Sequence, residues 1–274
     1  MDAVRRGEVS ILSSCLFFAL AALLIKLASS SFSGLFIAFF RFSLGAVLSM
    51  LALKAFHRDF RAYDLKHLTL RAVFGVSAMV SYYHAIQFTS SGRATLLNLT
   101  YPIFVAFYGF LFFKEAITRR NVFSILLCVI GVLTVFYDGT YYPLFGNFLG
   151  LASGALSGFA VHYIRKSRER NNPVIVYLAP CLLGLLACSP SIGESANLEL
   201  SGVLLLSSVA VLTFLGQLNL TYGYRYVQPT RGSVISFFTI PLAILFSLFI
   251  GEEMTLRFFI GTALIMLGLF INRK

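Results

Sequence analysis

The side chains of this chain that could carry out chemistry are few, and most of them lie in long apolar segments. His84 and His162 are titratable neutral side chains inside such segments, whereas Glu115 and Glu253 are expected at helix ends. Ionisable groups in apolar surroundings are costly and commonly mark ion or proton pathways. We therefore consider both histidines as candidates for carrying a proton, with hydrogen-bonded packing as the alternative.

Two cations, Lys26 and Arg41, also lie within apolar segments. Arg41 is about seven residues into the segment 35–54, which corresponds to a depth of about 10 Å in a helix. A long side chain can bring its charge back to the segment's end. We hypothesise that Arg41 attracts an anionic or carboxylate-bearing solute, and the alternative is such a return to the interface.

Other kinds of chemistry are disfavoured. The four cysteines show neither a Cys-x-x-Cys pair nor a Cys/His spacing typical of metal ligands, so no cofactor or metal is expected. The chain has no phosphate-binding loop for ATP. Glu252, Glu253 and Arg257 match a membrane-protease pattern whose downstream histidines are missing. An intramembrane enzyme would instead need Ser77 hydrogen-bonded to His162 as its base.

The composition explains why so few charges are available. The chain has 274 residues, of which 58% are apolar and 12% are charged. A soluble domain is about half apolar and about a quarter charged. A soluble enzyme, a disordered scaffold and a disulfide-rich secreted domain are therefore all disfavoured.

The apolar residues form segments of the length that a membrane-spanning helix needs, about 20 residues. Charged clusters and turn residues separate these segments, which leaves no room for a soluble domain. The sequence thus predicts an all-α integral membrane protein with ten transmembrane helices. They are expected at 9–28, 35–54, 69–88, 94–113, 121–137, 146–164, 172–189, 201–222, 233–251 and 257–272.

The basic residues are strongly biased toward one side of these segments. If the N-terminus is cytoplasmic, 18 of the 22 lysines and arginines fall in cytoplasmic segments, Arg71 among them. Arg93 and Arg257 fall outside, and Lys26 and Arg41 lie within spans. This bias predicts a multi-pass protein of the bacterial inner membrane with both termini in the cytoplasm. The net charge of +11 is then a topology signal, and nucleic acid is not expected as a partner.

The chain also contains an internal repeat, because residues 85–133 resemble residues 223–270. Each copy would contain five spans. Since five is odd, the second copy must be inverted in the membrane, as in secondary transporters with a central substrate cavity. We expect the repeats at 1–138 and 139–274. The matched pairs, 138 or 139 positions apart, are Phe88 and Tyr226, Arg93 and Arg231, Pro102 and Pro241, and Glu115 and Glu253.

Pro102 and Pro241 are expected to interrupt their helices, because proline lacks an N–H and clashes with the carbonyl four residues earlier. The freed carbonyls would be those of Asn98 and Phe237. Unpaired backbone at membrane depth is tolerated where it lines a cavity or is buried in protein. We interpret the two prolines as helix breaks with a gating role and expect Asn98 and Tyr101 to supply polar contacts there. The alternative is a packing kink.

Polar residues concentrate in the two aligned spans 69–88 and 201–222, and Tyr83 matches Tyr222 within one residue. Polar groups in spans are expected to face the protein interior. We therefore predict a polar substrate cavity, with ordinary interhelical hydrogen bonding as the alternative. The predicted substrate contacts are Arg41, Tyr83, His84, Asn98, Tyr101, His162, Gln217, Tyr222, Ser236 and Phe237.

These features together resemble the EamA-type family of the drug/metabolite transporter superfamily. The residues that carry the resemblance are Arg41-Phe42, Tyr82-Tyr83-x-Ala85-Ile86-x-Phe88-Thr89, Pro102 with Lys114-Glu115, and Tyr226, Pro241 and Gly251-Glu252-Glu253. The resemblance implies a basket-like ten-helix bundle with a central cavity, whose two halves rock to alternate access. Members carry amino acids, aromatic compounds, purines, sugar derivatives and other metabolites.

The sequence thus predicts a secondary transporter, not an enzyme, for a small polar or amphipathic metabolite such as an amino acid. Its partners would be that solute, the lipid bilayer and a coupling proton or counter-solute. A flippase for a lipid-linked substrate is the alternative. Monomer and dimer both stay open, although the glycine stripe at Gly146, Gly150, Gly154 and Gly158 favours close packing within the protein over a dimer contact.

Overall fold

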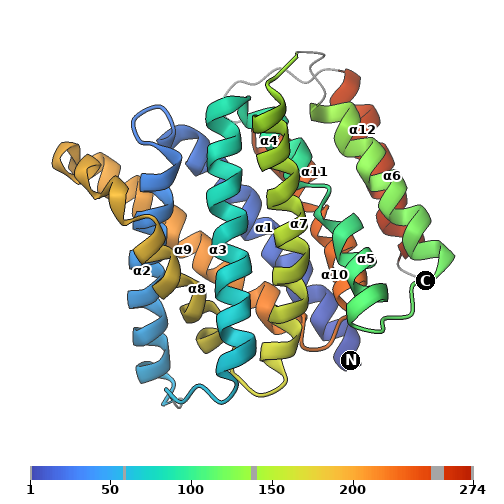
Figure 1. The fold of residues 1–274 in the computed structure, drawn as a ribbon, viewed down its shortest axis with the longest axis horizontal. Coiled ribbons are helices and arrows are strands. Elements are labelled where there is room, and N and C mark those ends of the chain that lie inside the picture. Colours follow the sequence, from blue (N-terminus) through green and yellow to red (C-terminus); the bar gives the residue numbers. More distant parts are fainter. Residues whose placement is uncertain (1, 58–59, 137–140, 248–255, 273–274) are drawn as a thin grey trace. The chain divides into compact units, whose positions relative to one another are not determined.

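The computed structural model describes residues 2–57, 60–136, 141–247 and 256–272 (Figure 1). Within these ranges every regular element is a helix. The chain divides into two compact units, and each unit combines early and late parts of the sequence. Unit 1 comprises Met1–Val76 and Tyr163–Tyr226, and unit 2 comprises Ser77–His162 and Val227–Lys274.

A helix occurs in every segment where the sequence predicts one. The helices are α1 (Ala3–Ala28), α2 (Gly34–Ala55), α3 (Leu65–Phe88), α4 (Ser91–Asn98), α5 (Tyr101–Phe112), α6 (Arg119–Phe136), α7 (Leu144–Arg168), α8 (Pro173–Ala187), a 3-10 helix η1 (Ser189–Asn197), α9 (Leu200–Gly223), α10 (Pro229–Ser236), α11 (Thr239–Ser247) and α12 (Leu256–Asn272).

Six helical segments of the described chain are long and apolar enough to cross a membrane, which makes the protein an integral membrane protein. They are Ala3–Ala28, Gly34–Ala55, Arg93–Phe112, Arg119–Phe136, Leu144–Arg168 and Leu200–Gly223. Pro173–Ala187 and Phe259–Ile271 are apolar but shorter. The prediction of ten spans is therefore not established by the helices alone.

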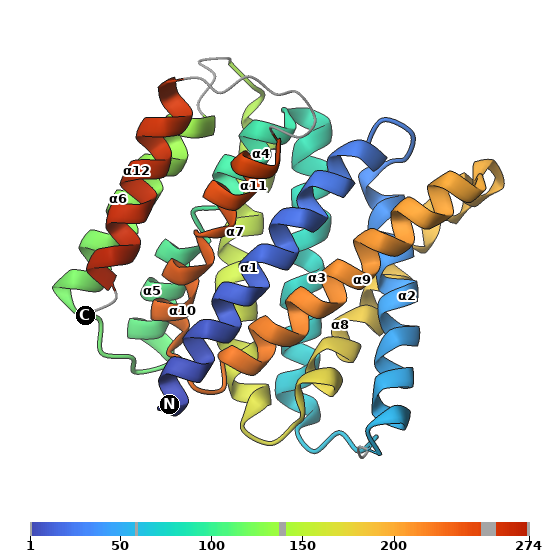
Figure 2. The ribbon, with the colours of Figure 1, turned by 180° about the vertical axis from the view of Figure 1, so that it is seen from behind.

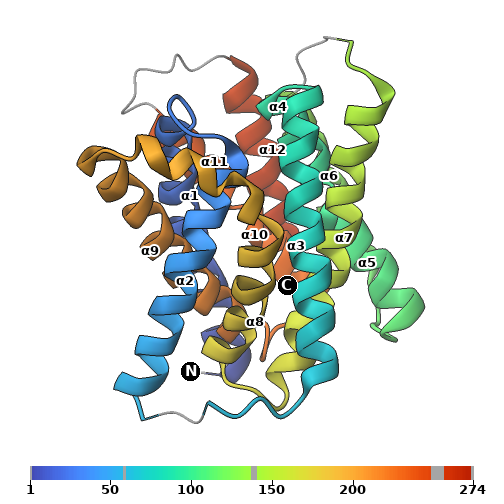
Figure 3. The same cartoon turned by 60° about the vertical axis from the view of Figure 1, so that its left-hand side comes forward.

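In unit 1, α1 and α9 lie side by side (Figure 2). They approach closely at Gly223, where an added Cβ would be 2.7 Å from the carbonyl oxygen of Gly7. Helix α2 packs against both α9 and α8 (Figure 3). Phe36 and Leu206, each 1% exposed, belong to the apolar core between α2 and α9. The small and apolar residues of these helices thus bury one another.

In unit 2, α6 and α12 form the closest helix pair (Figure 1). A Cβ at Gly131 would be 2.7 Å from the carbonyl oxygen of Gly261, so these two glycines set the spacing. Cys128 and Ile265 are fully buried between the two helices, and Phe237 belongs to the same core cluster. The cysteine therefore acts as a small apolar residue.

The glycine stripe of α7 packs against its own unit, as the sequence favours. Gly150 faces Leu97, and Gly158 faces Phe104. Between them, a Cβ at Gly154 would be 3.1 Å from the carbonyl oxygens of Leu97 and Asn98. The stripe thus lies along the segment from α4 to α5 and supports the point where the helix is interrupted.

The two predicted spans that contain Pro102 and Pro241 are both interrupted. Helix α4 ends at Asn98 and α5 begins at Tyr101, with Pro102 as its second residue. Helix α10 ends at Ser236 and α11 begins at Thr239. The prediction of a freed carbonyl at Phe237 is wrong, because this carbonyl accepts a hydrogen bond of 3.0 Å from the backbone N–H of Ile240. The tight turn at the break satisfies it.

Candidate functional site

The predicted substrate contacts are divided between the two units. Unit 1 contains Arg41, Gln217 and Tyr222. The other predicted contacts, together with Pro102 and Pro241, belong to unit 2. Asn98, Tyr101, Ser236 and Phe237 lie at the two helix breaks of unit 2, which come from the first and the second half of the sequence.

The two breaks meet through Tyr101 and Phe237. Their rings stack with centroids 6.5 Å apart, and the Tyr101 hydroxyl donates a hydrogen bond of 3.4 Å to the carbonyl oxygen of Ser233 on α10. Asn98 donates through its side-chain amide to the hydroxyl oxygen of Ser153 on α7, at 3.0 Å. Phe237 is 1% exposed, so it is a packing residue in this state and not an open binding surface.

Several other candidates make local contacts. The ring nitrogen Nδ1 of His84 is 2.8 Å from the carbonyl oxygen of Val80 on its own helix. The hydroxyl of Ser236 donates to the Gly232 carbonyl oxygen in the same way. Tyr83 is buried, whereas Tyr222 is 38% exposed and packs its ring on Tyr226. These contacts fit the packing alternative for each residue taken singly.

A buried acidic group that the sequence placed at a helix end is Glu115. Its carboxylate oxygen Oε1 is 3.9 Å from Nδ1 of His162, and its side chain is 10% exposed. Oε2 accepts a hydrogen bond of 2.8 Å from the hydroxyl of Thr230 on α10. The chain reaches this position because Lys114 adopts a left-handed backbone conformation (φ 54°), which turns Glu115 back so that its N–H donates to the Gly109 carbonyl oxygen.

The protonation of His162 follows from its other nitrogen. Nε2 is 2.8 Å from the carbonyl oxygen of Val105, and a carbonyl only accepts, so Nε2 carries the hydrogen. Nδ1, which faces Glu115, is therefore the nitrogen that gains or loses a proton. The ring of Phe113 stacks on the imidazole with centroids 4.1 Å apart. The pair is thus a buried acid and base within unit 2.

Unit 1 buries cations in a different setting. Arg71 of α3 is 8% exposed and its Nε has no hydrogen-bond partner among the described residues. On α8, the hydroxyl of Tyr177 has no hydrogen-bond partner among the described residues, and the thiol of Cys181 is fully buried. A Cβ at Gly45 would be 2.7 Å from this hydroxyl and 3.1 Å from this thiol, so the two polar groups lie against α2.

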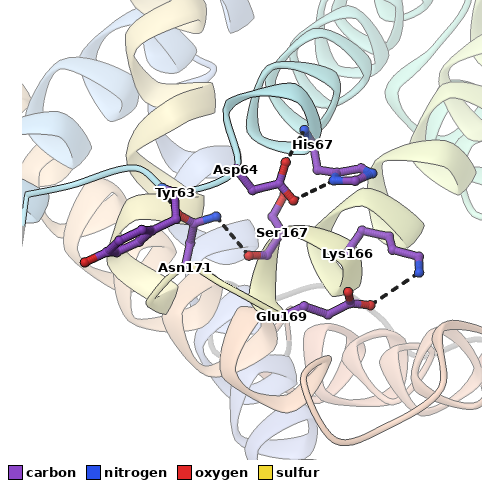
Figure 4. Close-up of polar contacts among 7 residues, drawn as sticks. All are labelled: Tyr63, Asp64, His67, Lys166, Ser167, Glu169 and Asn171. Carbon is purple, nitrogen blue, oxygen red and sulfur yellow. Dashed lines mark hydrogen bonds and ion pairs between the residues drawn. The ribbon is translucent and has the colours of Figure 1, made fainter.

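A second buried arginine of unit 1, Arg168, is fully engaged. It is 3% exposed and donates to the carbonyl oxygens of Thr221, at 3.2 Å, and Asn171. Asn171 in turn accepts from the backbone N–H of Tyr63 at 2.9 Å and donates to the Ser167 carbonyl oxygen at 3.1 Å (Figure 4). These bonds join the end of α7 to α9 and to the segment before α3.

Next to this network, Asp64 accepts hydrogen bonds from the ring and the backbone N–H of His67 (Figure 4). Burial raises the pKa of Asp64, but the hydrogen bonds and the charges of His67 and Arg170 outweigh that effect and lower the pKa below its ordinary value. The carboxylate is therefore the stable form. No group of three or more potential metal ligands occurs among the described residues.

Comparison with known proteins identifies the chain. The family model of the EamA-like transporter family matches residues 5–137 and again residues 144–273. This chain belongs to the EamA-like transporter family. Membership supports membrane transport of a small molecule, and the double match covers nearly the whole sequence.

Relatives of this EamA-family protein are similar along most of their length. An uncharacterised transporter of Archaeoglobus fulgidus is 27% identical over 93% of this chain and 94% of its own. The pseudopaline exporter CntI of Pseudomonas aeruginosa is 25% identical over 84% of this chain and 82% of its own. One crystal structure has a TM-score of 0.80 at 16% identity and covers 97% of this chain and 96% of its own, which shows the fold alone.

The sequence alone does not predict that the side chains of Arg71 and Glu115 are buried. Arg71 lies in the second turn of α3, which begins at Leu65, and is 8% exposed. Glu115 lies just beyond the end of α5, as predicted, and its side chain folds back into unit 2. A glycine lies beside each charged side chain, Gly75 four residues after Arg71 and Gly109 six residues before Glu115.

Proposed function

We propose that this protein is a secondary transporter that moves a small polar or amphipathic metabolite, such as an amino acid, across the bacterial inner membrane. Ten spans would form two inverted repeats, 1–138 and 139–274, around a central cavity, with both termini in the cytoplasm. The two halves would alternate access to that cavity. The chain would carry out no chemical reaction on its cargo.

The pair of helix breaks is the observation that carries this proposal. Asn98 to Tyr101 and Ser236 to Thr239 are interrupted at equivalent places of the two sequence repeats. Broken helices in corresponding positions of two repeats are typical of the substrate site of secondary transporters. The double match to the family model supports the same division of the chain. An enzyme is disfavoured, because His162 uses Nε2 to bond Val105 and no bond joins it to Ser77 among the described residues.

The Glu115–His162 pair is our candidate for the coupling proton. Because Nε2 of His162 already carries a hydrogen, one more proton can be gained at Nδ1 of His162 or on the carboxylate of Glu115. With this proton, the buried pair is electrically neutral. Losing the proton leaves a buried negative charge, which is costly in apolar surroundings. The pair would therefore release its proton when the surrounding helices open it to water. In this proposal, proton coupling depends on α5 and the turn after it, on α7 and on α10, which surround the pair.

Other titratable residues lie on the same elements as the pair. Tyr108 lies on α5 and stacks on Phe159 of α7, at a centroid distance of 3.8 Å. Lys114 precedes Glu115 in the turn, and Arg231 follows Thr230 on α10.

The test is solute flux in proteoliposomes with an imposed pH gradient. We expect saturable flux of at least one amino acid or related metabolite, accelerated by the gradient. Glu115→Gln should remove the acceleration by the gradient, whereas Glu169→Gln, at a surface carboxylate that pairs with Lys166, should not. Gradient-driven flux that survives Glu115→Gln would refute the coupling role. Movement of lipid-linked cargo without any solute flux would favour a flippase.

A further inference from the structure

A line of hydrogen bonds leads from the Glu115–His162 pair along α10. Oε2 of Glu115 accepts from the Thr230 hydroxyl at 2.8 Å. The carbonyl oxygen of Thr230 accepts from the Ser233 hydroxyl at 2.8 Å, and the carbonyl oxygen of Ser233 accepts from the Tyr101 hydroxyl at 3.4 Å. All of these residues belong to unit 2. The bonds therefore connect the acidic pair to Tyr101, the first residue of α5 after the first helix break.

Ring packing extends this line to the second helix break. The Tyr101 ring stacks on Phe237, which lies between α10 and α11, at a centroid distance of 6.5 Å. Phe237 and Thr230 are each 1% exposed, and Ser233 is fully buried. Because protein interiors are closely packed, a shift of one of these side chains displaces its neighbours. Thr230 thus lies between the titratable pair and both helix breaks.

The imidazole of His162 is held in place by its own contacts. Its Nε2 donates to the Val105 carbonyl oxygen at 2.8 Å, and the ring of Phe113 stacks on it with centroids 4.1 Å apart. The carboxylate of Glu115 occupies space that Gly109 leaves, since a Cβ there would be 2.9 Å from Oε2. A glutamate side chain has several rotatable bonds, so the carboxylate is the partner that moves more easily.

The distance between the two partners depends on the proton. Oε1 of Glu115 is 3.9 Å from Nδ1 of His162, which is beyond hydrogen-bond distance. A carboxylate accepts, and an unprotonated Nδ1 also accepts, so no hydrogen bond joins these two atoms without a proton. A protonated Nδ1 would form a charge-assisted hydrogen bond of about 2.8 Å, for which the carboxylate must approach by about 1 Å. The bond from Thr230 would then break, or it would pull the start of α10 along.

We propose that Thr230 transmits the protonation state of the Glu115–His162 pair to α10 and, through α10, to the two helix breaks. This inference rests on the proposed coupling role of the pair, and it assigns Thr230 as a positioning residue for the carboxylate. A proton from water binds at Nδ1, the carboxylate moves toward His162, and α10 shifts against α5. Release of the proton to water reverses these movements. The helix breaks, where we expect the solute to bind, therefore change shape when the proton binds.

Among the described residues, His162 is the titratable side chain that forms an ion-pair contact with Glu115. Tyrosine, lysine, arginine and cysteine ordinarily titrate at about pH 8 or above, whereas histidine titrates near neutral pH. A response near neutral pH that also depends on Glu115 therefore reports this pair. The other titratable residues of α10, of the turn after α5 and of the helices packed against α10 are Tyr101, Tyr108, Lys114, Arg119, Arg120, Cys128, Arg231 and Arg257.

The chain contains no tryptophan, so a single fluorescent reporter can be placed beside the second break. Phe238→Trp replaces a half-buried aromatic residue next to Phe237 in the purified full-length protein. We expect its emission in detergent to change between about pH 8 and about pH 5. Adding Thr230→Val, which removes the hydroxyl and keeps the shape, should abolish most of this change. Thr230→Ser keeps the hydroxyl and should retain it, as should Thr213→Val, at a buried threonine of unit 1.

The other possible results also decide the question. Emission that does not change with pH, a full response in Thr230→Val or in Glu115→Gln, or an equal loss in Thr213→Val would overturn the role of Thr230. If Thr230→Val does not fold, Ser233→Ala removes the next bond of the line, and a full response in this variant would equally overturn it. A response that depends on Thr230, without solute flux in proteoliposomes, would retain the link and reject the transporter proposal.

Discussion

Arg168 and Arg71 lie in the same compact unit and are 3% and 8% exposed, yet their surroundings differ completely. Arg168 donates to backbone carbonyls at the end of α7 and on α9, so its donors are used in holding helices together. The Nε of Arg71, in contrast, is buried without an acceptor among the described residues. The exposed fraction of a charged side chain therefore does not reveal its role. The number of its donors that have acceptors does.

The largest expected effect concerns stability. Arg168→Met should lower the free energy of unfolding by about 2 to 4 kcal/mol, because two buried carbonyls each lose a donor worth about 1 to 3 kcal/mol. Arg71→Met removes a charge that has no protein partner, so it should change stability little or raise it. Thermal unfolding of both variants in one detergent measures the difference. Equal losses of stability would mean that Arg71 also has a structural role.

A smaller effect is expected at Gly45, where α2 packs against α8. A Cβ there would be 2.7 Å from the Tyr177 hydroxyl, so Gly45→Ala should push this hydroxyl away from its position. We expect the free energy of unfolding to fall by about 1 to 3 kcal/mol, the usual cost of overpacking. Gly193→Ala, where an added Cβ would contact nothing within 4 Å, is the matched control. Equal stability of the two variants would show that the Tyr177 ring moves aside without cost.

The smallest expected effect concerns Asp64, which lies next to the hydrogen-bond network of Arg168. Because the pKa of Asp64 is lowered in the folded protein, its carboxylate stabilises the fold above its unfolded pKa, and that stability is lost as the pH falls through the folded pKa. Asp64→Asn should therefore cost a few tenths of a kcal/mol near pH 7 and nothing in strong acid. Unfolding midpoints measured between these limits give the profile. A cost that persists in acid would point to packing instead.

The fold was largely predictable from the sequence. Long apolar segments locate helices because no other element satisfies its own backbone hydrogen bonds in lipid. The prolines at 102 and 241 indicate interruptions because a proline in a helix removes one backbone hydrogen bond and clashes with the preceding turn, although α8 continues through Pro180. Two features were not predictable in this way. The carbonyl of Phe237 accepts a hydrogen bond from a new donor in the turn. The number of membrane spans is not determined by the positions of the helices.

The candidate site was less predictable, because it depends on contacts between distant residues. The burial of Glu115 requires the left-handed conformation of Lys114, which a lysine rarely adopts and no local pattern announces. The burial of Arg71 depends on a helix that starts four residues before the apolar segment does. Arg41 is predicted as a candidate for anion binding, and in the structure its guanidinium lies 5.0 Å from the ring centroid of Phe42.

The glycine stripe of α7 has a consequence for how this sequence can change. Gly150, Gly154 and Gly158 each face a different piece of the interrupted helix, from Leu97 to Phe104. A side chain at Gly150 would meet Leu97 before the break, one at Gly154 the break itself, and one at Gly158 would meet Phe104 after it, so no single compensating substitution could make room at all three. Substitutions on α7 should therefore be tolerated unequally around the helix. The face with Gly150, Gly154 and Gly158 should accept only glycine, whereas the other faces should accept many residues.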